Sequence, residues 1–305
     1  MRFFAQIIFA LIVIVAMYSG ASIFRIGEPL ENRANHTCQM MQYKQNLARQ
    51  VRRPGLFVIG ASNVTYGIRS ELLSQKVGLP VVNLGLPASL GINMIFASAR
   101  SVLKPGDVAL LNIEHFFFIV YPADGPFFKK ALFQCPTDAY RDLEPTELIK
   151  MFVAQAPLDL FMGVTQRAAR LLHLPLPFVV TVYPFESPTA LNKYGDFPSN
   201  TKSKRTREME ADAATPGGIT LDFSLESDGV PALRQFVKWA REHDIRVVVS
   251  WPAVYWPSKD KAAPGLVKLR AFYESLGLPV LGDPMDTMRP LDEFFKTNSL
   301  IRIII

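Results

Sequence analysis

The chain has 305 residues, of which 49% are hydrophobic and 20% charged. This composition supplies a packed core, excludes a chain that is disordered throughout, and suits one large domain or one domain with a sizeable insertion. The formal charge of +6 is scattered, with one short cluster from Lys202 to Arg207. We interpret that cluster as a solvated loop and expect no nucleic acid among the partners; an anionic surface or acidic polysaccharide is the weaker alternative.

An uncharged apolar segment opens the chain. Residues 3–24 carry no charged side chain, and a run of that length can cross a ~30 Å hydrocarbon core as a helix. Arg2 precedes it, and the charges from Arg25 to Arg33 cancel one another, so the bulk of the chain is expected on the extracytoplasmic, periplasmic side. We therefore expect residues 1–24 to form an uncleaved single-pass anchor in the inner membrane. A cleavable signal peptide ending near residues 19–22 is the alternative.

Residues 25–54 are expected to form a polar, partly helical stalk, and residues 55–305 the domain. The first part of that domain alternates strands with helices. Its first strand is a continuous apolar run, which is typical of a strand buried on both faces. The β-α-β-α-β order predicts an α/β fold, with a parallel sheet and helices on both faces. The predicted strands are 56–59, 80–84 and 107–113, and the predicted helices are 70–77 and 91–103.

The alternation resumes near the C-terminus. The predicted elements there are a helix at 230–243, a strand at 245–249, a helix at 266–276 and a strand at 278–281. Residues 118–225 separate the two parts and are too many for an ordinary connection, so we interpret them as an insertion or a lid. Within the insertion, residues 145–172 are predicted to be helical.

The chain has two cysteines, Cys38 and Cys135. Neither lies in a CxxC motif or a Cys/His cluster, so no metal site is expected. In an oxidising compartment they can pair. Two free buried thiols are the alternative, because sequence spacing does not fix the distance between their Cα atoms. No P-loop and no GxGxxG motif occurs, and no cofactor is expected.

The first predicted strand leads directly into Gly60-Ala61-Ser62-Asn63. In an open parallel sheet, sites form beyond the carboxyl ends of the strands. A serine on such a turn, before a helix, can present its Oγ outward as a nucleophile. Taken alone, a Gly-x-Ser sequence after a strand is more often only a turn.

Residues Leu56 to Asn63 resemble the first block of the SGNH (GDSL-like) hydrolases, in which the serine is the nucleophile. Val82-Asn83-Leu84-Gly85 resembles the second block, whose glycine offers its N–H to the oxyanion. The resemblance covers roughly residues 55–117 and 230–298. It implies a flavodoxin-like parallel sheet, with Ser62 as the catalytic residue and the Ser62 and Gly85 amides as oxyanion donors.

Combined with the N-terminal anchor, the chain looks most like the branch of that family that works beside membrane-bound O-acyltransferases. That branch modifies bacterial cell envelopes and exopolysaccharides and includes DltD-like and alginate-acetylation proteins. The resemblance thus implies a polysaccharide substrate and a membrane-bound O-acyltransferase as partner.

The family's third block, a Gly-x-Asn after the third strand, has no clear counterpart. The expected asparagine falls near Phe116, whereas Asn112 lies inside the predicted strand and Glu114-His115 occupy its end. His115 precedes three phenylalanines. It is either a site residue or a packed histidine.

The family's base is an Asp and a His after the last strand, and here it is missing. Residues 294–298 resemble the approach to that block, but Lys296 replaces the Asp, and Ser299-Leu300 stand in place of Tyr-His. A second register uses Asp292 as the acid and still has no His. The four histidines of the chain are His36, His115, His173 and His243.

The resemblance therefore implies an extracytoplasmic esterase or O-acetyltransferase that is impaired by the missing His. The alternative is a non-catalytic saccharide-binding or accessory protein. Either the sequence is truncated or frame-disturbed at its C-terminal end, or the site has decayed. Without imidazole, we expect a poor esterase, in which Ser62→Ala changes turnover little.

Overall fold

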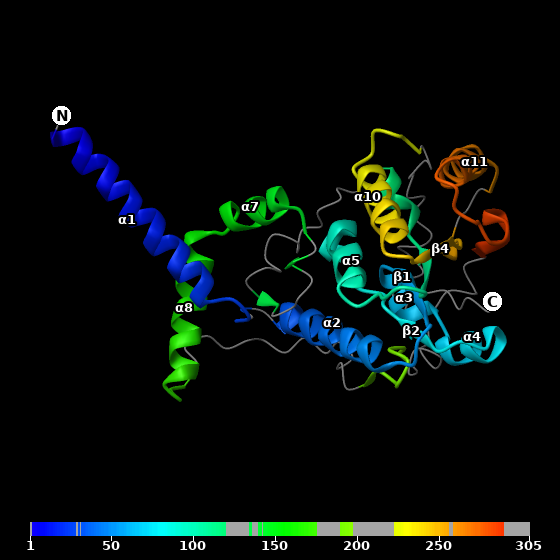
Figure 1. Ribbon diagram of the computed structural model, residues 1–305, viewed down its shortest axis with the longest axis horizontal. Coiled ribbons are helices and arrows are strands. Elements are labelled where there is room, and N and C mark those ends of the chain that lie inside the picture. The colour runs from blue at the N-terminus through cyan, green and yellow to red at the C-terminus, as the bar shows by residue number, and fades with distance from the viewer. Residues whose placement is uncertain are drawn as a thin grey trace, which may run out of the picture.

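A four-stranded parallel sheet forms the centre of this α/β molecule (Figure 1). The computed structural model describes residues 2–28, 30, 32–119, 134–135, 140–141, 143–175, 190–197, 223–255 and 259–289. The strands stand in the order β2-β1-β3-β4, all parallel. Their bounds are Leu56–Gly60 for β1, Val81–Asn83 for β2, Val108–Asn112 for β3 and Arg246–Val249 for β4.

The register of the sheet brings two predicted strand ends together. β1 pairs with β2 on one side (Leu56 with Val81) and with β3 on the other (Gly60 with Asn112). Both β1 and β3 are buried throughout, as expected for apolar runs covered on both faces. The predicted strand at 278–281 is reduced to a single parallel bridge between Val280 and Val249. A small second sheet pairs β5 (Val254–Tyr255) with β6 (Met288–Arg289).

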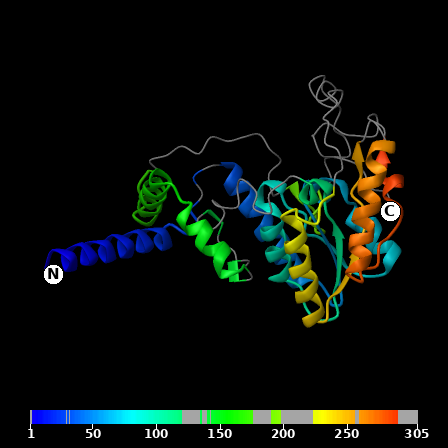
Figure 2. The same ribbon diagram turned by 90° about the horizontal axis from the view of Figure 1, so that it is seen from above.

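Helices cover both faces of the sheet (Figure 2). Phe57 and Ile59 of β1 belong to the larger core cluster, together with residues of α2, α5 and α10, whereas Val58 joins a smaller cluster with Leu73 of α4. This alternation follows from the period of two along a strand. The helices are α2 (Asn32–Gln50), α3 (Ser62–Gly67), α4 (Ser70–Val77), α5 (Gly91–Arg100), α10 (Gly229–Glu242) and α11 (Lys259–Ser275).

The segment expected to be a stalk contributes to the core. Within residues 25–54, helix α2 packs against β2 and α5, and Met40, Met41 and Ala48 are completely buried. Lys44 lies on the same buried side. The segment is polar on average, but its buried residues recur at helical spacing. They therefore lie on one face of α2, and this face packs against the sheet.

The cysteines form a disulfide, with their Cα atoms 4.9 Å apart. The sequence left two alternatives open, a disulfide or two free thiols, and the structure has the disulfide. The bond joins α2 to the segment 118–225 and closes a separation of 97 residues.

The helical stretch predicted at 145–172 is two helices. α7 (Pro145–Val153) and α8 (Pro157–Leu171) meet at an angle of 91°. Pro157 is the first residue of α8; it has no N–H to donate to the preceding turn, and it suits the first turn of a new helix. The apolar N-terminal segment forms α1 (Arg2–Phe24), which is long and apolar enough to cross a membrane.

Candidate functional site

The candidate site lies at the carboxyl edge of the sheet, between β1 and β3. The chain leaves β1 through Ala61 into α3, whose first residue is Ser62. It leaves β3 through Ile113 and Glu114 into a 3-10 turn at His115–Phe118. Because β2 and β3 flank β1 on opposite sides, the strand order reverses here, at the crevice where open α/β sheets bind ligands.

Glu114 is the immediate neighbour of Ser62. The Ser62 hydroxyl, which is half-buried, donates to Glu114 Oε1 at 3.5 Å. The same carboxylate accepts the backbone N–H of Ala61 on Oε2 at 3.1 Å and that of Asn63 on Oε1 at 3.0 Å. Glu114 therefore bonds to the turn that presents Ser62, both before and after the serine.

The Glu114 carboxyl is buried, and burial raises its pKa from 4.5 to about 7. Desolvation penalises the charged form and outweighs the hydrogen bonds from Asn63, Ala61 and Ser62, which favour it. An ordinary carboxylate is a weak base at neutral pH. With a pKa of about 7, this one is as basic as the imidazoles that usually accept a proton from serine.

The two glycines of the sequence blocks are required by close backbone approaches. A Cβ on Gly60 would lie 2.2 Å from the Asn112 carbonyl oxygen, and one on Gly85 would lie 2.4 Å from the Thr65 nitrogen. Gly85 thus allows the backbone of α3 at Val64 and Thr65 to pack closely on the chain just after β2. This packing reason for Gly85 holds whether or not its amide has a chemical role.

The Gly85 amide is part of a buried network behind the site. Its N–H donates to Asn83 Oδ1 at 2.9 Å, and its carbonyl accepts from Lys44 Nζ at 2.7 Å. Lys44 also donates to Asn83 Oδ1 at 3.0 Å, and Asn83 Nδ2 donates to the Val64 carbonyl of α3 at 2.7 Å. Burial lowers the pKa of Lys44 to about 7, despite the opposing charge of Asp196. The network ties α2, β2 and α3 into one unit.

Asp196 joins this network from the segment 118–225. Its carboxylate accepts from the backbone N–H of Ser70 at 2.8 Å, from the Ser70 hydroxyl at 2.7 Å and from Asn83 Nδ2 at 3.0 Å. In addition, the backbone N–H of Asn83 donates to the Tyr194 carbonyl at 2.9 Å. Part of the segment read as an insertion therefore packs on the free edge of β2, beside the second sequence block.

A second polar group surrounds Asn112 at the end of β3. Asn112 accepts from Asn63 Nδ2 and donates to the Trp251 carbonyl at 2.9 Å. His115 lies beside Trp251, with 5.9 Å between ring centroids. Both His115 ring nitrogens and Trp251 Nε1 are buried without a hydrogen-bond partner among the described residues, and burial lowers the pKa of His115 to about 4. The imidazole is therefore held neutral at physiological pH.

The structure brings some of the candidate residues together and leaves others outside the described part of the chain. Ser62 begins α3 and Gly85 packs against the same helix, but the Gly85 N–H is bonded to Asn83. The roles of Ser62 as nucleophile and of the Ser62 and Gly85 amides as oxyanion donors stay predictions. Asp292, the segment 294–298 and the basic cluster from Lys202 lie outside the described residues.

Sequence reasoning missed the contact of Glu114 with Ser62 and that of Lys44 with Asn83. Glu114 had a detectable signal, since it directly follows a predicted strand at the edge where Ser62 was expected. Lys44 had no such signal, because its partner Asn83 is 39 residues away. Within the described ranges, no three His, Cys, Asp or Glu side chains lie together as a metal site would need.

Comparison with known proteins found no matching family model, no matching curated protein and no matching solved structure.

Proposed function

We propose that the chain is a membrane-anchored, extracytoplasmic esterase or O-acyltransferase of the SGNH type, in which Ser62 is the nucleophile and Glu114 its base. The observation that carries this proposal is the hydrogen bond from Ser62 Oγ to Glu114 Oε1 at the carboxyl edge between β1 and β3. A serine nucleophile needs a neighbouring base, and Glu114 is a base with a pKa of about 7.

The strand order supports the fold assignment within this proposal. The order β2-β1-β3-β4, with Val280 bridged to β4, agrees with the 2-1-3-4-5 order of flavodoxin-like sheets. A fold does not by itself establish a function, which depends on the residues of the site. The saccharide substrate and a membrane-bound O-acyltransferase as partner come to this proposal from the resemblance of the two sequence blocks and the anchor.

The proposed chemistry is acyl transfer in two steps. The Glu114 carboxylate accepts the Ser62 proton while Oγ bonds to the acyl carbon, and the ester's alcohol leaves with the proton that Glu114 returns. A saccharide hydroxyl or water then gives its proton to Glu114 and attacks the acyl carbon of the acyl-serine; the bond from that carbon to Ser62 Oγ breaks, and Oγ takes the proton back from Glu114. Protonation neutralises Glu114 and weakens its bonds to the Ala61 and Asn63 amides, which frees these donors for the developing oxyanion.

Turnover is expected to be slow, because three amide donors of the site are occupied before the reaction. Ala61 and Asn63 donate to Glu114, and Gly85 donates to Asn83. A missing oxyanion donor typically costs 10²–10³-fold in rate. The chain should therefore work well below ~10 per second, a typical enzyme rate.

The test is hydrolysis of p-nitrophenyl acetate by the full chain in detergent. We expect slow turnover that rises with pH through about 7 as Glu114 loses its proton, and that Ser62→Ala and Glu114→Gln each lower by at least ~10-fold. Ser275→Ala, a serine on α11 bonded to the Phe272 carbonyl, is the matched control. The sequence alone led us to expect little effect of Ser62→Ala; the bond to Glu114 reverses that expectation.

The second candidate function is a non-catalytic saccharide-binding or accessory protein. One observation favours it: the N–H groups of Ala61, Asn63 and Gly85 all have acceptors within the protein. If Ser62→Ala leaves hydrolysis unchanged, and a fluorophosphonate probe does not modify Ser62 by peptide mass spectrometry, the enzyme proposal is rejected in favour of this one.

A further inference from the structure

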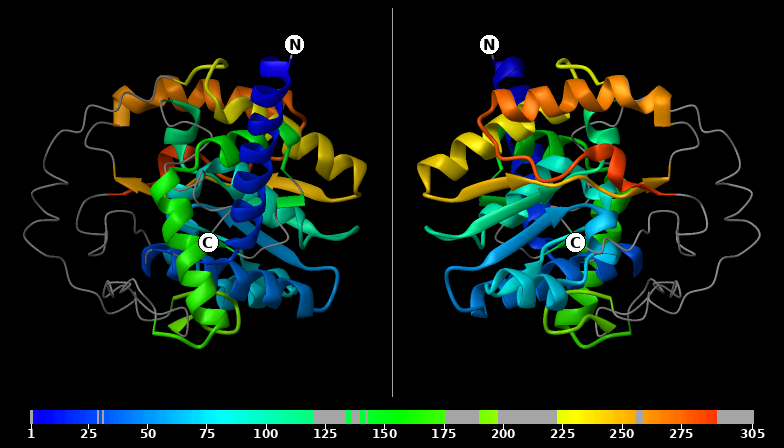
Figure 3. Two further views of the ribbon diagram at one scale, coloured as in Figure 1. Left: turned by 90° about the vertical axis from the view of Figure 1, so that its left-hand side faces the viewer. Right: turned by 90° about the vertical axis from the view of Figure 1, so that its right-hand side faces the viewer.

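Helices α7 and α8 are attached to the C-terminal end of the apolar helix α1. The Tyr18 hydroxyl donates to the carbonyls of Phe152 at 3.2 Å and Gln155 at 3.3 Å, and the Tyr18 and Phe152 rings meet edge to face. Gln155 Nε2 also donates to the buried Ser22 hydroxyl at 3.4 Å. Figures 1 and 3 show α8 beside this end of α1, and Figure 1 shows that it lies away from the sheet.

Charged side chains fasten the same joint just beyond α1. The Arg25 guanidinium donates to the Asp159 carbonyl and lies on Gly163 of α8, where a Cβ would meet it at 2.5 Å. Arg170 of α8 pairs with Glu28 at 2.8 Å. Because Arg25 and Glu28 are almost fully buried, the joint is packed and α8 has a defined place against α1.

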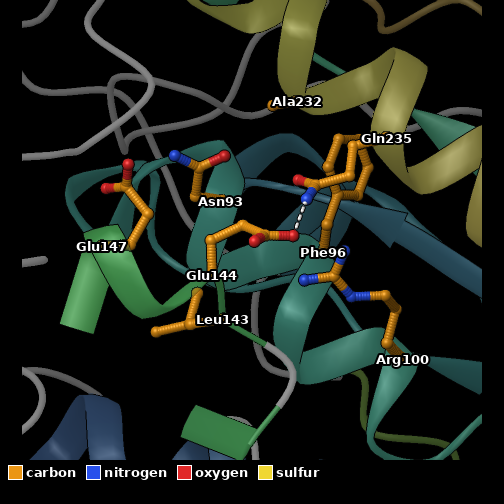
Figure 4. A pocket seen from close by; sticks show the side chains of 8 residues that line it. All are labelled: Asn93, Phe96, Arg100, Leu143, Glu144, Glu147, Ala232 and Gln235. Atoms are coloured by element: carbon orange, nitrogen blue, oxygen red, sulfur yellow. Dashed lines mark hydrogen bonds between the residues drawn. The ribbon is translucent and has the colours of Figure 1, made fainter.

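The other end of this pair of helices is attached to the α/β core. Glu144, which precedes α7, accepts a hydrogen bond from Gln235 of α10. Figure 4 shows this bond beside Phe96 and Arg100 of α5. The α7–α8 pair therefore bridges the anchor and the domain.

One side of α8 carries exposed apolar side chains. Leu158 and Phe161 of α8 and Leu172, the residue that follows it, fall on one face at intervals of three and eleven residues, and Phe161 is 64% exposed. The buried face consists of Gly163, Gln166 and Ala169. α7 adds Ile149 and Val153, which are 61% and 73% exposed. Exposed apolar side chains in this number mark a surface that has a partner.

The depth of the joint along α1 indicates what that partner is. Tyr18 lies six residues before the end of α1 at Phe24, which is ~9 Å along a helix. Interfacial helices bury their apolar face ~5–10 Å into the boundary between headgroups and acyl chains, and tyrosine is enriched there. All side chains of residues 2–17 are exposed, so the apolar surface of α1 continues into that of α8.

We propose that α7 and α8 lie in the headgroup region of the membrane that α1 spans, on the side of the domain, with Ile149, Val153, Leu158, Phe161 and Leu172 in contact with lipid. With 9 and 15 residues, each helix is too short to span, and the 91° bend between them prevents them from crossing as one straight helix. The proposal rests on the membrane anchor of the proposed function. It makes the bilayer the partner of this segment and restrains the distance of the Ser62 edge from the membrane.

The test places one environment-sensitive fluorophore (NBD) at a time on the full chain in nanodiscs of phosphatidylcholine and phosphatidylglycerol. Because the native cysteines are paired, Phe161→Cys and Leu158→Cys supply unique thiols. Val267→Cys on α11 is the matched control, since Val267 is also an apolar residue and is 67% exposed. Ile8→Cys reports on α1. We expect blue-shifted emission at Phe161 and Leu158, and quenching by nitroxide on the upper acyl chain that is several-fold stronger than at Val267.

Three results would overturn the proposal, and they differ from one another. Quenching at Ile8 with none at Phe161 and Leu158 would leave α1 in the membrane and remove α7–α8 from it. Absence of quenching at all three would show that the anchor itself is wrong. If the fluorophore at Phe161 showed blue-shifted emission in native membranes but not in nanodiscs of pure lipid, the surface would be assigned to another membrane protein.

Discussion

At the scale of single residues, two adjacent side chains at the end of β3 respond to burial in opposite directions. Burial raises the pKa of Glu114 to about 7 and lowers that of His115 to about 4, because each loses the hydration of its charged form. Glu114 has hydrogen-bond donors to offset this loss, whereas His115 has no partner among the described residues. Of the two, only Glu114 therefore changes its charge near neutral pH.

Glu114→Gln should change the pH dependence of stability. Between pH 4.5 and about 7, the folded chain keeps a proton on Glu114 that the unfolded chain has lost, so the free energy of unfolding falls as pH rises through this window, by up to ~3 kcal/mol. The variant lacks this slope. The stability of the original minus that of the variant should therefore decrease from pH 5 to pH 8 in urea unfolding in detergent. His115, present in both proteins, cancels from the difference. A pH-independent difference would contradict the burial of an ionisable Glu114.

At the scale of elements, the site depends on how closely α3 approaches the end of β2. That approach requires Gly85, and it is held by Asn83, which bonds to the Val64 carbonyl and to Lys44. Because α3 begins with Ser62, the position of the serine depends on contacts that involve neither the serine nor Glu114.

Gly85→Ala should therefore destabilise the protein, although alanine keeps the N–H that an oxyanion needs. The added Cβ would lie 2.4 Å from the Thr65 nitrogen, which is backbone and cannot rotate away. We expect a loss of at least ~1–3 kcal/mol in urea unfolding. The comparison is Gly78→Ala, where φ is +68° and no atom lies within 4 Å, so only the ~1–2 kcal/mol left-handed penalty applies. If Gly85→Ala were as stable as the original chain, the packing of α3 would not require a glycine at this position.

At the scale of the whole molecule, contacts at several places join the described parts of the segment 118–225 to the rest, in addition to the bond between Glu144 and Gln235 of α10. The disulfide fixes it to α2, Asp196 fixes it to β2 and α4, and the joint at Tyr18 and Arg25 fixes it to α1. The segment is thus tied both to the domain that carries Ser62 and to the apolar helix α1.

Replacing both cysteines, by Cys38→Ser with Cys135→Ser, should lower the free energy of unfolding. Closing a loop of 97 residues is worth about 4–5 kcal/mol in the chain-entropy model. Urea unfolding under non-reducing conditions measures the loss, and a reducing agent should reproduce it in the original chain while leaving the double variant unchanged. If the disulfide of the original chain were fully reduced and the free energy of unfolding did not fall, this prediction would be contradicted.

Local patterns in the sequence determined the elements that form by short-range rules. The apolar run of α1, the buried strands β1 and β3, helix α4 at 70–77 and the serine after β1 all follow from periodicity, hydrophobicity and turn residues within a few positions. The parallel four-stranded sheet follows from their alternation. Pairing of Cys38 with Cys135 remained one of two alternatives, because sequence spacing gives no Cα distance.

Only the tertiary structure decided which polar side chains meet. Glu114 and Ser62 are 52 residues apart, Lys44 and Asp196 reach Asn83 across 39 and 113 residues, and Tyr18 meets Gln155 across 137. No local pattern encodes such pairs. A buried polar or charged side chain needs hydrogen-bond partners, and here those partners come from residues far away in the sequence. For the same reason the sequence of residues 25–54 predicts only a polar, partly helical stalk, because the acceptors that allow Lys44 to be buried lie on β2 and the loop after it.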